Sequence, residues 1–155
     1  KEEVETLEQE HTAAPHTRIL QRTLAKDITT RVHSLTDYEK AVEISDIFFN
    51  GGIDDMKRMS NDDLESVFVS LDKNAFTIKR TDLEYGIPVL DLLATVTTVF
   101  PSKGEARKMI QAGGVSVNKE KAGDPNSVLN NAQLLNNKFI LVQRGKKNYY
   151  LLKAE

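Results

Sequence analysis

The sequence predicts an α+β protein, in which an N-terminal helical domain is followed by a small domain of two helices packed on a short, mostly antiparallel sheet. Apolar residues recur with a helical period through residues 2–71. A helix, a glycine turn and a strand follow one another over residues 101–118, and two short apolar segments have strand composition. We therefore expect a helical domain over residues 1–72, a linker over residues 73–86 and the sheet domain over residues 87–155.

The helical domain begins with a charged helix over Glu2–Glu10. Pro15 suits the first turn of a second helix, which is expected from about His16 to Val32. This second helix has an apolar stripe on one side and a basic stripe on another. The apolar stripe consists of Leu20, Leu24, Ile28 and Val32, and the basic stripe of Arg18, Arg22 and Lys26.

A third helix is expected to start near Thr36, because Thr36 and Glu39 form a capping box, and Gly51–Gly52 should end it. A shorter helix is predicted from Asn61 to Leu71, with Ser60 as its N-cap. The buried side of the third helix is predicted to contain Tyr38, Ala41, Val42, Ser45, Phe48 and Phe49.

In the sheet domain, Pro88 is expected to open a helix through Val89, Leu92, Leu93 and Val96, which Phe100–Pro101 closes. Ser102 and Glu105 form a further capping box, so the next helix should start at Lys103. Its core face has the i, i+3, i+4 spacing of a buried stripe, and it consists of Ala106, Met109 and Ile110. The opposite, polar stripe consists of Lys103, Arg107, Lys108 and Gln111.

Gly113 and Gly114 supply the permissive backbone that ends this helix, and residues 115–118 then alternate between apolar and polar as a half-buried strand does. Two more strands are expected at residues 139–142 and 149–152, joined by a basic loop at residues 144–148. The sheet domain should therefore carry basic residues on one helix and on one strand connection.

The net charge of −2 hides a strong asymmetry along the chain. Residues 1–100 contain 11 Lys+Arg against 19 Asp+Glu, whereas residues 101–155 contain 10 against 4. A basic C-terminal third favours a polyanionic partner. Chance segregation of charge between two domains is the competing explanation.

Residues 101–118, PSKGEARKMIQAGGVSVN, resemble the alpha-L motif, a small RNA-binding module first described in a ribosomal protein of the small subunit. In that family a pair of helices presents basic residues to RNA, and a Gly-Gly-Val-x-Val-Asn turn leads into the sheet. The resemblance implies that the basic residues pair with phosphates and that Gln111 and Asn118 bond sugars or base edges. The RNA-binding residues expected on this basis are Lys103, Arg107, Lys108, Gln111, Asn118, Lys119, Lys121, Arg144, Lys146 and Lys147.

Contacts from about four of these cations to phosphate would give log affinity a slope of about −3 against log salt. Tyr149 has two competing interpretations: it is a platform on which a base stacks, or, as strand residues more often are, a core residue. The alternative to RNA binding is that the basic face of this helix is an ordinary solvated surface without a partner.

A second resemblance concerns residues 10–33, EHTAAPHTRILQRTLAKDITTRVH, which are similar to the helical region that follows the catalytic domain in bacterial-type tyrosyl-tRNA synthetases. In that family an alpha-L-type domain ends in a strand such as residues 146–150. Order and spacing agree over residues 8–50 and 88–152, and residues 51–87 match weakly. The matching positions of the helical region are Glu10, His11, Arg18, Gln21, Leu24, Ala25, Thr29, Val32 and His33.

This resemblance implies the tRNA-binding C-terminal part of a class I ligase that attaches tyrosine to its tRNA using ATP. The implied partner is a tyrosine tRNA, held at its anticodon stem and long variable arm, with Arg18, Arg22 and Lys26 able to reach the anticodon region. A plain solvated face is the more frequent role of such a stripe. We expect a cytoplasmic protein whose catalytic domain, lying upstream of Lys1, makes the parent a homodimer, and a monomeric 155-residue chain.

No catalytic chemistry is predicted for these 155 residues. The His-Ile-Gly-His-like and Lys-Met-Ser-Lys-Ser-like motifs of such ligases are missing from the sequence, and Lys57-Arg58-Met59-Ser60 matches the second by composition only. The sequence has no Cys, and its three His have no metal-site spacing, so we expect neither a metal nor a cofactor, and ATP belongs to the catalytic domain. No apolar run approaches the length of about 18 residues that a membrane span needs.

Two other functions compete with this interpretation. One is a stand-alone RNA-binding module of a ribosomal or RNA-modification protein, which would bind unrelated RNA hairpins equally well. The other is a helical protein-interaction domain with an incidental basic tail, whose RNA binding would not depend on the basic stripe.

Overall fold

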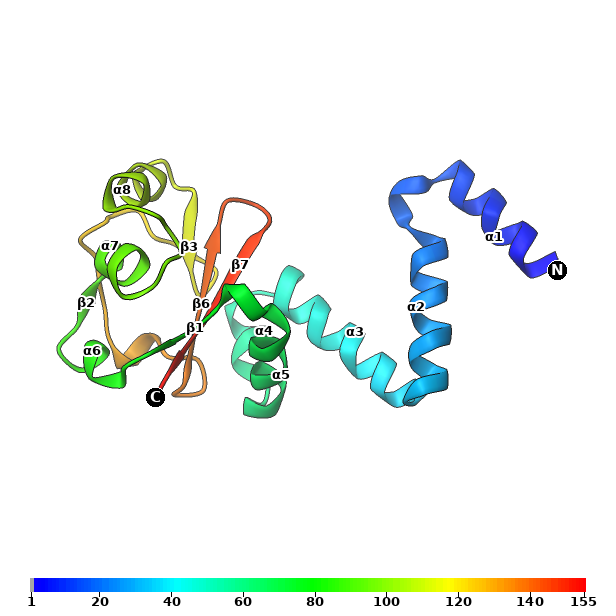
Figure 1. Ribbon diagram of the computed structural model, residues 1–155, viewed down its shortest axis with the longest axis horizontal. Coiled ribbons are helices and arrows are strands. Elements are labelled where there is room, and N and C mark those ends of the chain that lie inside the picture. The colour runs from blue at the N-terminus through cyan, green and yellow to red at the C-terminus, as the bar shows by residue number, and fades with distance from the viewer. Residues whose placement is uncertain (1) are drawn as a thin grey trace. The chain divides into compact units, whose positions relative to one another are not determined.

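The computed structural model describes residues 2–155, with side chains from Val4 onward. The chain forms two compact units, one ending at Phe49 and one spanning Asn50–Glu155 (Figure 1). This division differs from the expected one, which placed residues 50–72 in the helical domain. The helices of residues 50–72 belong to the second unit because α5 packs against two strands of its sheet.

The first unit consists of helices: α1 (Glu2–Ala13), the short 3₁₀ turn η1 (Pro15–Thr17), α2 (Ile19–Val32) and α3 (Leu35–Asn50, the first unit ending at Phe49). The second helix starts later than expected, at Ile19 rather than near His16. Pro15 opens a 3₁₀ turn instead, and Arg18 adopts a left-handed conformation with φ 55° that separates this turn from α2. The end of α2 at Val32 and the stop of α3 before Gly51 agree with the prediction, whereas α1 ends three residues later than expected and α2 starts three residues later.

The N-cap of α3 is Ser34, not Thr36. The Ser34 hydroxyl accepts from the backbone N–H of Asp37 at 3.0 Å and donates to the Asp37 carboxylate at 2.7 Å. As in the predicted Thr36–Glu39 pair, a hydroxyl residue caps the helix with an acidic residue three positions later, but here the carboxylate bonds the hydroxyl itself. The capping chemistry was therefore recognised correctly, but its position was wrong by two residues.

The apolar stripe of α2 lies in contact with solvent. Leu24, Ile28 and Val32 are 60%, 51% and 68% exposed, and no residue of α2 is buried. On α3 the predicted buried side reduces to Phe48, since Val42 and Phe49 are about half exposed. A helical period alone identifies an apolar face, and whether another element covers that face is a separate question.

The second unit begins with two helices, α4 (Ile53–Arg58) and α5 (Asn61–Leu71). The latter matches its predicted bounds, and Ser60 caps it as expected. The Ser60 hydroxyl accepts from the Asp63 backbone N–H at 3.1 Å, and the Asp63 carboxylate accepts from the Ser60 N–H at 3.3 Å.

A five-stranded sheet follows, in the order β1-β7-β6-β3-β4. Its first strand pairs in parallel with its last, Ala75 opposite Leu151, while the remaining neighbours are antiparallel. A separate short pair joins β2 to β5. The strands are β1 (Ala75–Ile78), β2 (Ile87–Pro88), β3 (Val115–Val117), β4 (Glu120–Lys121), β5 (Val128–Leu129), β6 (Phe139–Arg144) and β7 (Asn148–Ala154).

The expected linker over residues 73–86 is instead part of the sheet unit. It contains the end of the 3₁₀ turn η2 (Asp72–Asn74), the edge strand β1 and the helix α6 (Arg80–Glu84). The strand is held by packing as well as by pairing, because Ile78 is 3% exposed and Phe76 lies 6.3 Å from Tyr150, ring centre to ring centre. Four residues flanked by Asn74 and Lys79 carry too little local pattern to be recognised as a strand.

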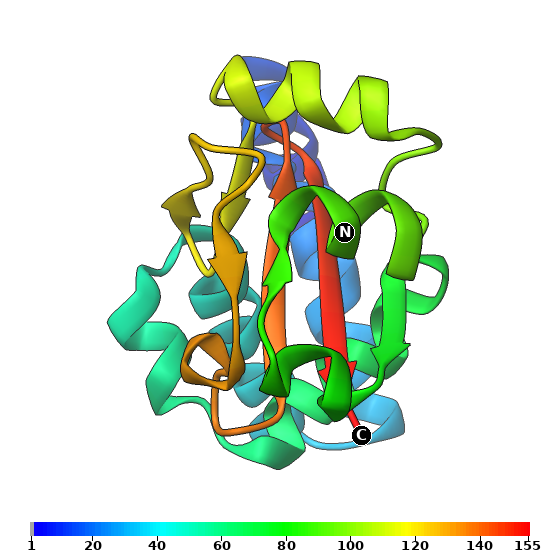
Figure 2. The same cartoon turned by 90° about the vertical axis from the view of Figure 1, so that its left-hand side faces the viewer.

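Both faces of the sheet are covered. One face, with Ile140, Val142 and Leu152, joins the main core under α7 (Val89–Asp91), the π-helical segment η3 (Leu92–Val96) and α8 (Lys103–Gln111). The other face carries Phe139, whose ring centre lies 6.3 Å from that of Phe68 on α5. The sheet is thus the middle layer of three, and Figure 2 shows β6 and β7 running through its centre.

Candidate nucleic-acid interface

The helix α8 places a basic face in solvent. Ala106 and Ile110 are fully buried, which fixes the rotation of the helix and leaves Arg107, Lys108 and Gln111 exposed on the opposite side. Ser102 caps the helix by accepting from the Glu105 backbone N–H at 3.2 Å. This face therefore agrees with the predicted polar stripe.

Lys103, the first residue of that stripe, is committed to an intramolecular contact. Its ammonium group lies 2.5 Å from a carboxylate oxygen of Asp91 in α7. By contrast, Arg107 and Lys108 form no ion pair with any residue that the structure describes. The charge that α8 offers to a polyanion is therefore concentrated at Arg107 and Lys108.

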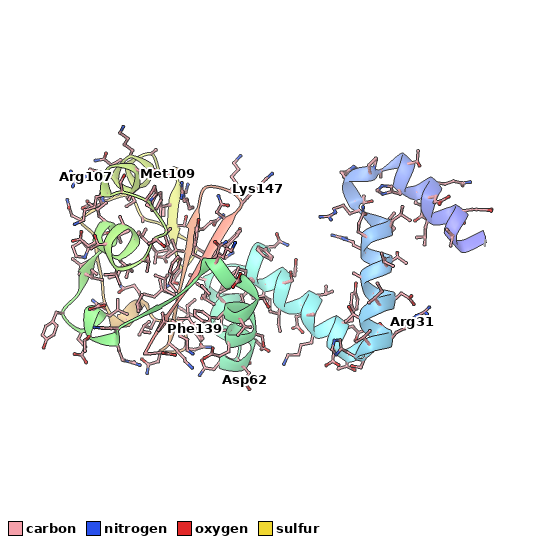
Figure 3. The ribbon with its side chains drawn as sticks, viewed as in Figure 1. Arg31, Asp62, Arg107, Met109, Phe139 and Lys147 are labelled. Carbon is pink, nitrogen blue, oxygen red and sulfur yellow. The ribbon has the colours of Figure 1, made fainter. Side chains whose placement is uncertain are left out.

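Gly113 and Gly114 are required by the tight turn between α8 and β3. Gly113 has φ +68°, a conformation that favours glycine. At Gly114 a Cβ atom would lie 2.6 Å from the sulfur of Met109 and 3.3 Å from its carbonyl oxygen. The two glycines thus let β3 start directly beside the last turn of α8, next to Met109 (Figure 3).

The connection from β3 to β4 is a two-residue hairpin turn at Asn118 and Lys119, both left-handed with φ 48° and 70°. Asn118 is 8% exposed and turns inward. Its side-chain oxygen accepts from the Leu141 N–H at 2.9 Å, and its amide group donates to the Gln133 carbonyl at 2.5 Å. This placement does not agree with the expectation that Asn118 bonds RNA, because its polar atoms already bond the protein.

Arg144, at the end of β6, also makes its contacts within the protein. Its guanidinium donates to the Val99 carbonyl at 2.9 Å and to the Glu105 carboxylate at 2.7 Å. It lies over the ring of Phe100, 4.6 Å from the ring centre. An arginine held on three sides fixes α8 and the preceding loop to the sheet, which differs from the expected direct role in RNA contact.

The remaining predicted cations gather at the same end of the unit as α8. Lys146 and Lys147 are exposed at the tip of the β6–β7 hairpin, and Figure 3 shows Arg107 and Lys147 at this end. Lys121 donates from its ammonium to the Gly113 carbonyl at 2.6 Å. We call this region the cationic end, defined by Arg107, Lys108, Lys119, Lys121, Lys146 and Lys147.

Lys119 is the least solvated of these cations. Its ammonium lies 5.1 Å from the ring centre of Tyr149, and burial lowers the pKa of the Lys119 ammonium. Tyr149 is half-buried, and its hydroxyl accepts from the Gln143 amide at 3.1 Å. A partly desolvated ammonium over an aromatic ring gains electrostatic stabilisation when an anion approaches it.

A row of polar side chains crosses the sheet beneath the cationic end, and sequence inspection missed it. In register, Ser116 is opposite Lys121 on one side and Gln143 on the other, and Gln143 is opposite Tyr149. The Val-Ser-Val alternation of β3 already placed Ser116 on the polar face. Only the pairing of β3 with β6 brings Gln143 beside it.

The basic stripe of α2 belongs to the first unit. Arg18, Arg22 and Lys26 are exposed, and none of them forms an ion pair with a described residue. Arg18 also supplies the left-handed residue that precedes α2. The stripe is therefore available to an anionic partner, and a solvated face is equally compatible with it.

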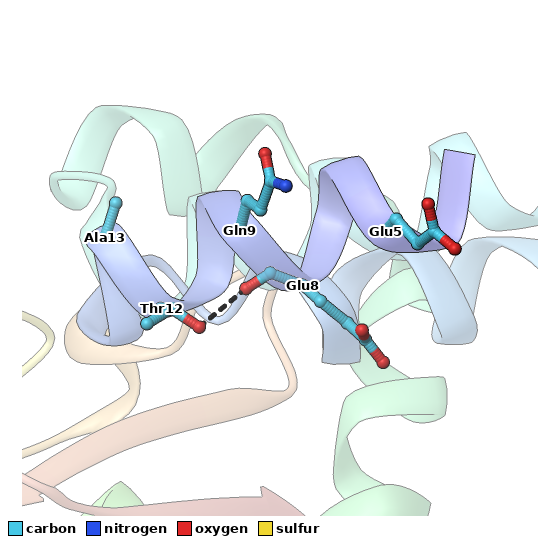
Figure 4. Close-up of a pocket in the computed structure, with 5 residues that line it drawn as sticks. All are labelled: Glu5, Glu8, Gln9, Thr12 and Ala13. Carbon is cyan, nitrogen blue, oxygen red and sulfur yellow. Dashed lines mark hydrogen bonds between the residues drawn. The ribbon is translucent and has the colours of Figure 1, made fainter. Parts of the chain in front are cut away.

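Other kinds of site find little support. Among residues 2–155, no three His, Cys, Asp or Glu side chains are grouped so as to hold a metal ion. A shallow hollow on α1 is lined by Glu5, Glu8, Gln9, Thr12 and Ala13, and within it the Thr12 hydroxyl donates to the Glu8 carbonyl at 2.7 Å (Figure 4). No helix in the described part of the chain is long and apolar enough to cross a membrane.

A helix, a glycine turn and a hairpin-linked sheet with cations at one end define the class of protein: a small α+β domain of the alpha-L type, preceded by helices. Comparison with known sequences is consistent with this class. Residues 76–152 match the family model described as the tyrosine–tRNA ligase SYY-like C-terminal domain. The chain belongs to the tyrosine–tRNA ligase family.

Two relatives illustrate the similarity. The tyrosine–tRNA ligase of Cytophaga hutchinsonii is 53% identical over 99% of this chain, and that of Parabacteroides distasonis is 49% identical over 100% of it. In each case the chain spans only 36% of the relative's length. A solution structure of a tyrosyl-tRNA synthetase C-terminal domain aligns with 63% of this chain and 91% of its own, at 28% identity and a TM-score of 0.46.

Proposed function

We propose that this chain binds tyrosine tRNA and that the cationic end is its main contact with the RNA. The observation that carries the proposal is the state of four cations: Arg107 and Lys108 on α8, and Lys146 and Lys147 on the hairpin. All four are exposed, and none forms an ion pair with a described residue. Unpaired cations that converge from two elements are the expected footprint of a phosphate backbone.

The identity of the RNA rests on the relatives, which are named as tyrosine–tRNA ligases. We infer that the whole protein attaches tyrosine to its tRNA using ATP, which its catalytic domain would consume. In this proposal the cationic end and the α2 stripe hold the long variable arm and the anticodon stem. The catalytic domain would also bring two copies together, in the cytoplasm, whereas the 155-residue chain would be monomeric.

The residues proposed to contact RNA differ from the set expected from the sequence. Arg107, Lys108, Gln111, Lys119, Lys121, Lys146 and Lys147 are retained. Lys103 is retained as a weaker contact because of its ion pair with Asp91, whereas Asn118 and Arg144 are assigned structural roles.

The test is a titration of the chain with tyrosine tRNA and with a tRNA that lacks the long variable arm, each at two salt concentrations. Preferential, salt-sensitive binding of tyrosine tRNA is expected. Equal binding of both RNAs would favour a general RNA-binding module. Absence of binding to either RNA would overturn the proposal.

A pair of variants locates the interface. Arg107→Ala/Lys108→Ala should weaken tRNA binding and make the slope of log affinity against log salt shallower by about 1.5, since two phosphate contacts are lost. The matched control is Lys57→Ala/Arg58→Ala, which removes the same two residue types from exposed neighbouring positions at the end of α4. Equal effects of the two variants would show that general charge attraction, and not the cationic end, binds the RNA.

A further inference from the structure

A pocket opens at the cationic end, between the turn after α8, the β3–β4 turn and the tip of the β6–β7 hairpin. It encloses about 470 Å³, within the ~300–1,000 Å³ typical of small-ligand sites. Three glycines form part of its wall. Its polar lining consists of Ser116, Lys119, Lys121, Gln143 and Lys146.

We propose that this pocket takes a single unstacked nucleotide of the bound RNA, with a phosphate against Lys119, Lys121 and Lys146 and the sugar or base edge against Ser116 and Gln143. This inference rests on the proposed function, because it names a subsite within the same RNA-binding surface. It goes beyond that function by assigning a polar recognition site, in addition to a charged surface.

The charge of the lining selects an anion. Lys119 lies in the β3–β4 turn, Lys121 on β4 and Lys146 in the β6–β7 turn, and none of the residues that line the pocket is Asp or Glu. The ammonium of Lys121 is fixed by its bond to the Gly113 carbonyl and still has two other protons to donate. Lys119 is held over the Tyr149 ring, so two of the three cations are positioned before any ligand arrives.

Ser116 and Gln143 add uncharged donors and acceptors. They lie opposite each other in the β3–β6 pairing, on the same face of the sheet. The Gln143 amide nitrogen is directed to the Tyr149 hydroxyl at 3.1 Å, which leaves its oxygen as an acceptor. Within the described residues the Ser116 side chain makes no hydrogen bond. A 2′-hydroxyl or a base edge would satisfy both groups, whereas inorganic phosphate would satisfy neither fully.

The glycines make close approach possible. No atom lies within 4 Å of the position of a Cβ on Gly145, and at Gly113 the only neighbour is the Lys121 ammonium at 3.9 Å. The Gly145 N–H donates to the Gly114 carbonyl at 2.7 Å, so the hairpin tip is tied to the glycine turn across the pocket. Bare backbone on two walls gives a sugar-phosphate group room that side chains would remove.

The test uses the 155-residue chain, isotope-labelled for NMR, and titrates it separately with the four nucleoside 5′-monophosphates and with inorganic phosphate. We expect amide shifts at Gly113, Gly114 and Gly145 and at the Gln143 side chain, with nucleotides binding more tightly than phosphate. Ser116→Ala and Gln143→Met should each weaken nucleotide binding by about three- to tenfold, the contribution of one or two hydrogen bonds. Lys57→Ala/Arg58→Ala, at exposed positions on α4 outside the pocket lining, is the control that should leave nucleotide binding unchanged.

The same variants separate this inference from the proposed function. Ser116→Ala and Gln143→Met should weaken tRNA binding without changing its salt slope, because they remove no charge. Normal tRNA binding by both variants, together with equal affinity for phosphate and nucleotides, would overturn the pocket and leave the proposed function intact. Nucleotide binding at the pocket without tRNA binding would overturn the proposed function instead.

Discussion

Arg144 and Glu105 form a 2.7 Å ion pair that ties the end of β6 to the first turn of α8. The same guanidinium lies over Phe100 and donates to the Val99 carbonyl. Together with the buried Ala106 and Ile110, this side chain therefore holds the basic face of α8 in place relative to the hairpin. The distance between the two groups of proposed phosphate contacts depends on it.

Replacing Arg144 should consequently destabilise the sheet unit. We expect Arg144→Ala to lower the free energy of unfolding by about 2 kcal/mol, because two hydrogen bonds and the contact with Phe100 are lost. Arg144→Lys should recover less than half of this, since one ammonium cannot make both bonds in the same plane. Urea unfolding measures both changes, and full recovery by Lys would contradict the bidentate role.

Substitutions at Asn118 separate two contributions to stability: the hydrogen bonds of its side chain and the left-handed conformation of its backbone. Asn118→Gly keeps the left-handed turn but leaves the Leu141 N–H and the Gln133 carbonyl without their partner, at an expected cost of about 2 kcal/mol. Asn118→Ala should cost about 1 kcal/mol more, because a Cβ disfavours φ 48°. Equal unfolding free energies for the two variants would show that the turn conformation contributes nothing.

The contact between Gly114 and Met109 predicts a rescue. Gly114→Ala places a Cβ 2.6 Å from the Met109 sulfur, and we expect a loss of about 1–3 kcal/mol from this overpacking. In a Met109→Ala background the same substitution should cost less than about 1 kcal/mol, because the sulfur is gone. A double-mutant cycle measured by thermal or urea unfolding gives the coupling. Simple additivity would exclude the steric explanation.

The ionic contacts of Glu65 predict a dependence of stability on pH. The hydrogen bond from Lys138, at 2.5 Å, lowers the pKa of the Glu65 carboxyl from its ordinary value of 4.5, and Lys153, at 3.1 Å, acts in the same direction. Because the folded-state pKa is depressed, this stabilisation is present above about pH 4.5 and is lost as the pH falls through the folded-state value.

Glu65→Gln should therefore reduce the unfolding free energy at pH 7 by a few tenths to about 1 kcal/mol, a value limited by solvent screening. Below the folded-state pKa of Glu65 the difference between the two proteins should vanish. Denaturation curves collected from pH 7 down to about pH 3 measure it. A difference that stays constant over this range would contradict an ionic origin.

How far the sequence predicts this structure depends on how local each signal is. Ser60 and Ser102 cap their helices as expected, and Gly113 has the left-handed conformation that its position after a helix predicts. Each of these signals lies within a few residues of the element it determines. Helix α8 and its exposed Arg107 and Lys108 could therefore be placed without a structure.

What the sequence could not predict depends on contacts between distant residues. Strand β1 is recognisable only through its pairing with β7, and Ser116 meets Gln143 only through the register of β3 on β6. In the sequence, Arg144 and Lys146 are both basic residues of the same hairpin. In the structure, Arg144 holds α8 through Glu105, whereas Lys146 is exposed. Residue type alone does not separate a cation that binds the protein from one that is available to a partner.

The position of β7 between β1 and β6 has a consequence for how the sheet unit folds. Strand β7 pairs on both sides and comes after the other strands of this sheet in the chain, so its Leu151 pairs with Ala75 across most of the unit. Such long-range pairing costs loop-closure entropy before any stabilising contacts form, and this slows folding. During synthesis, the ribosome would have to release residues 148–154 before the sheet can close, so the sheet unit should fold late and in one step.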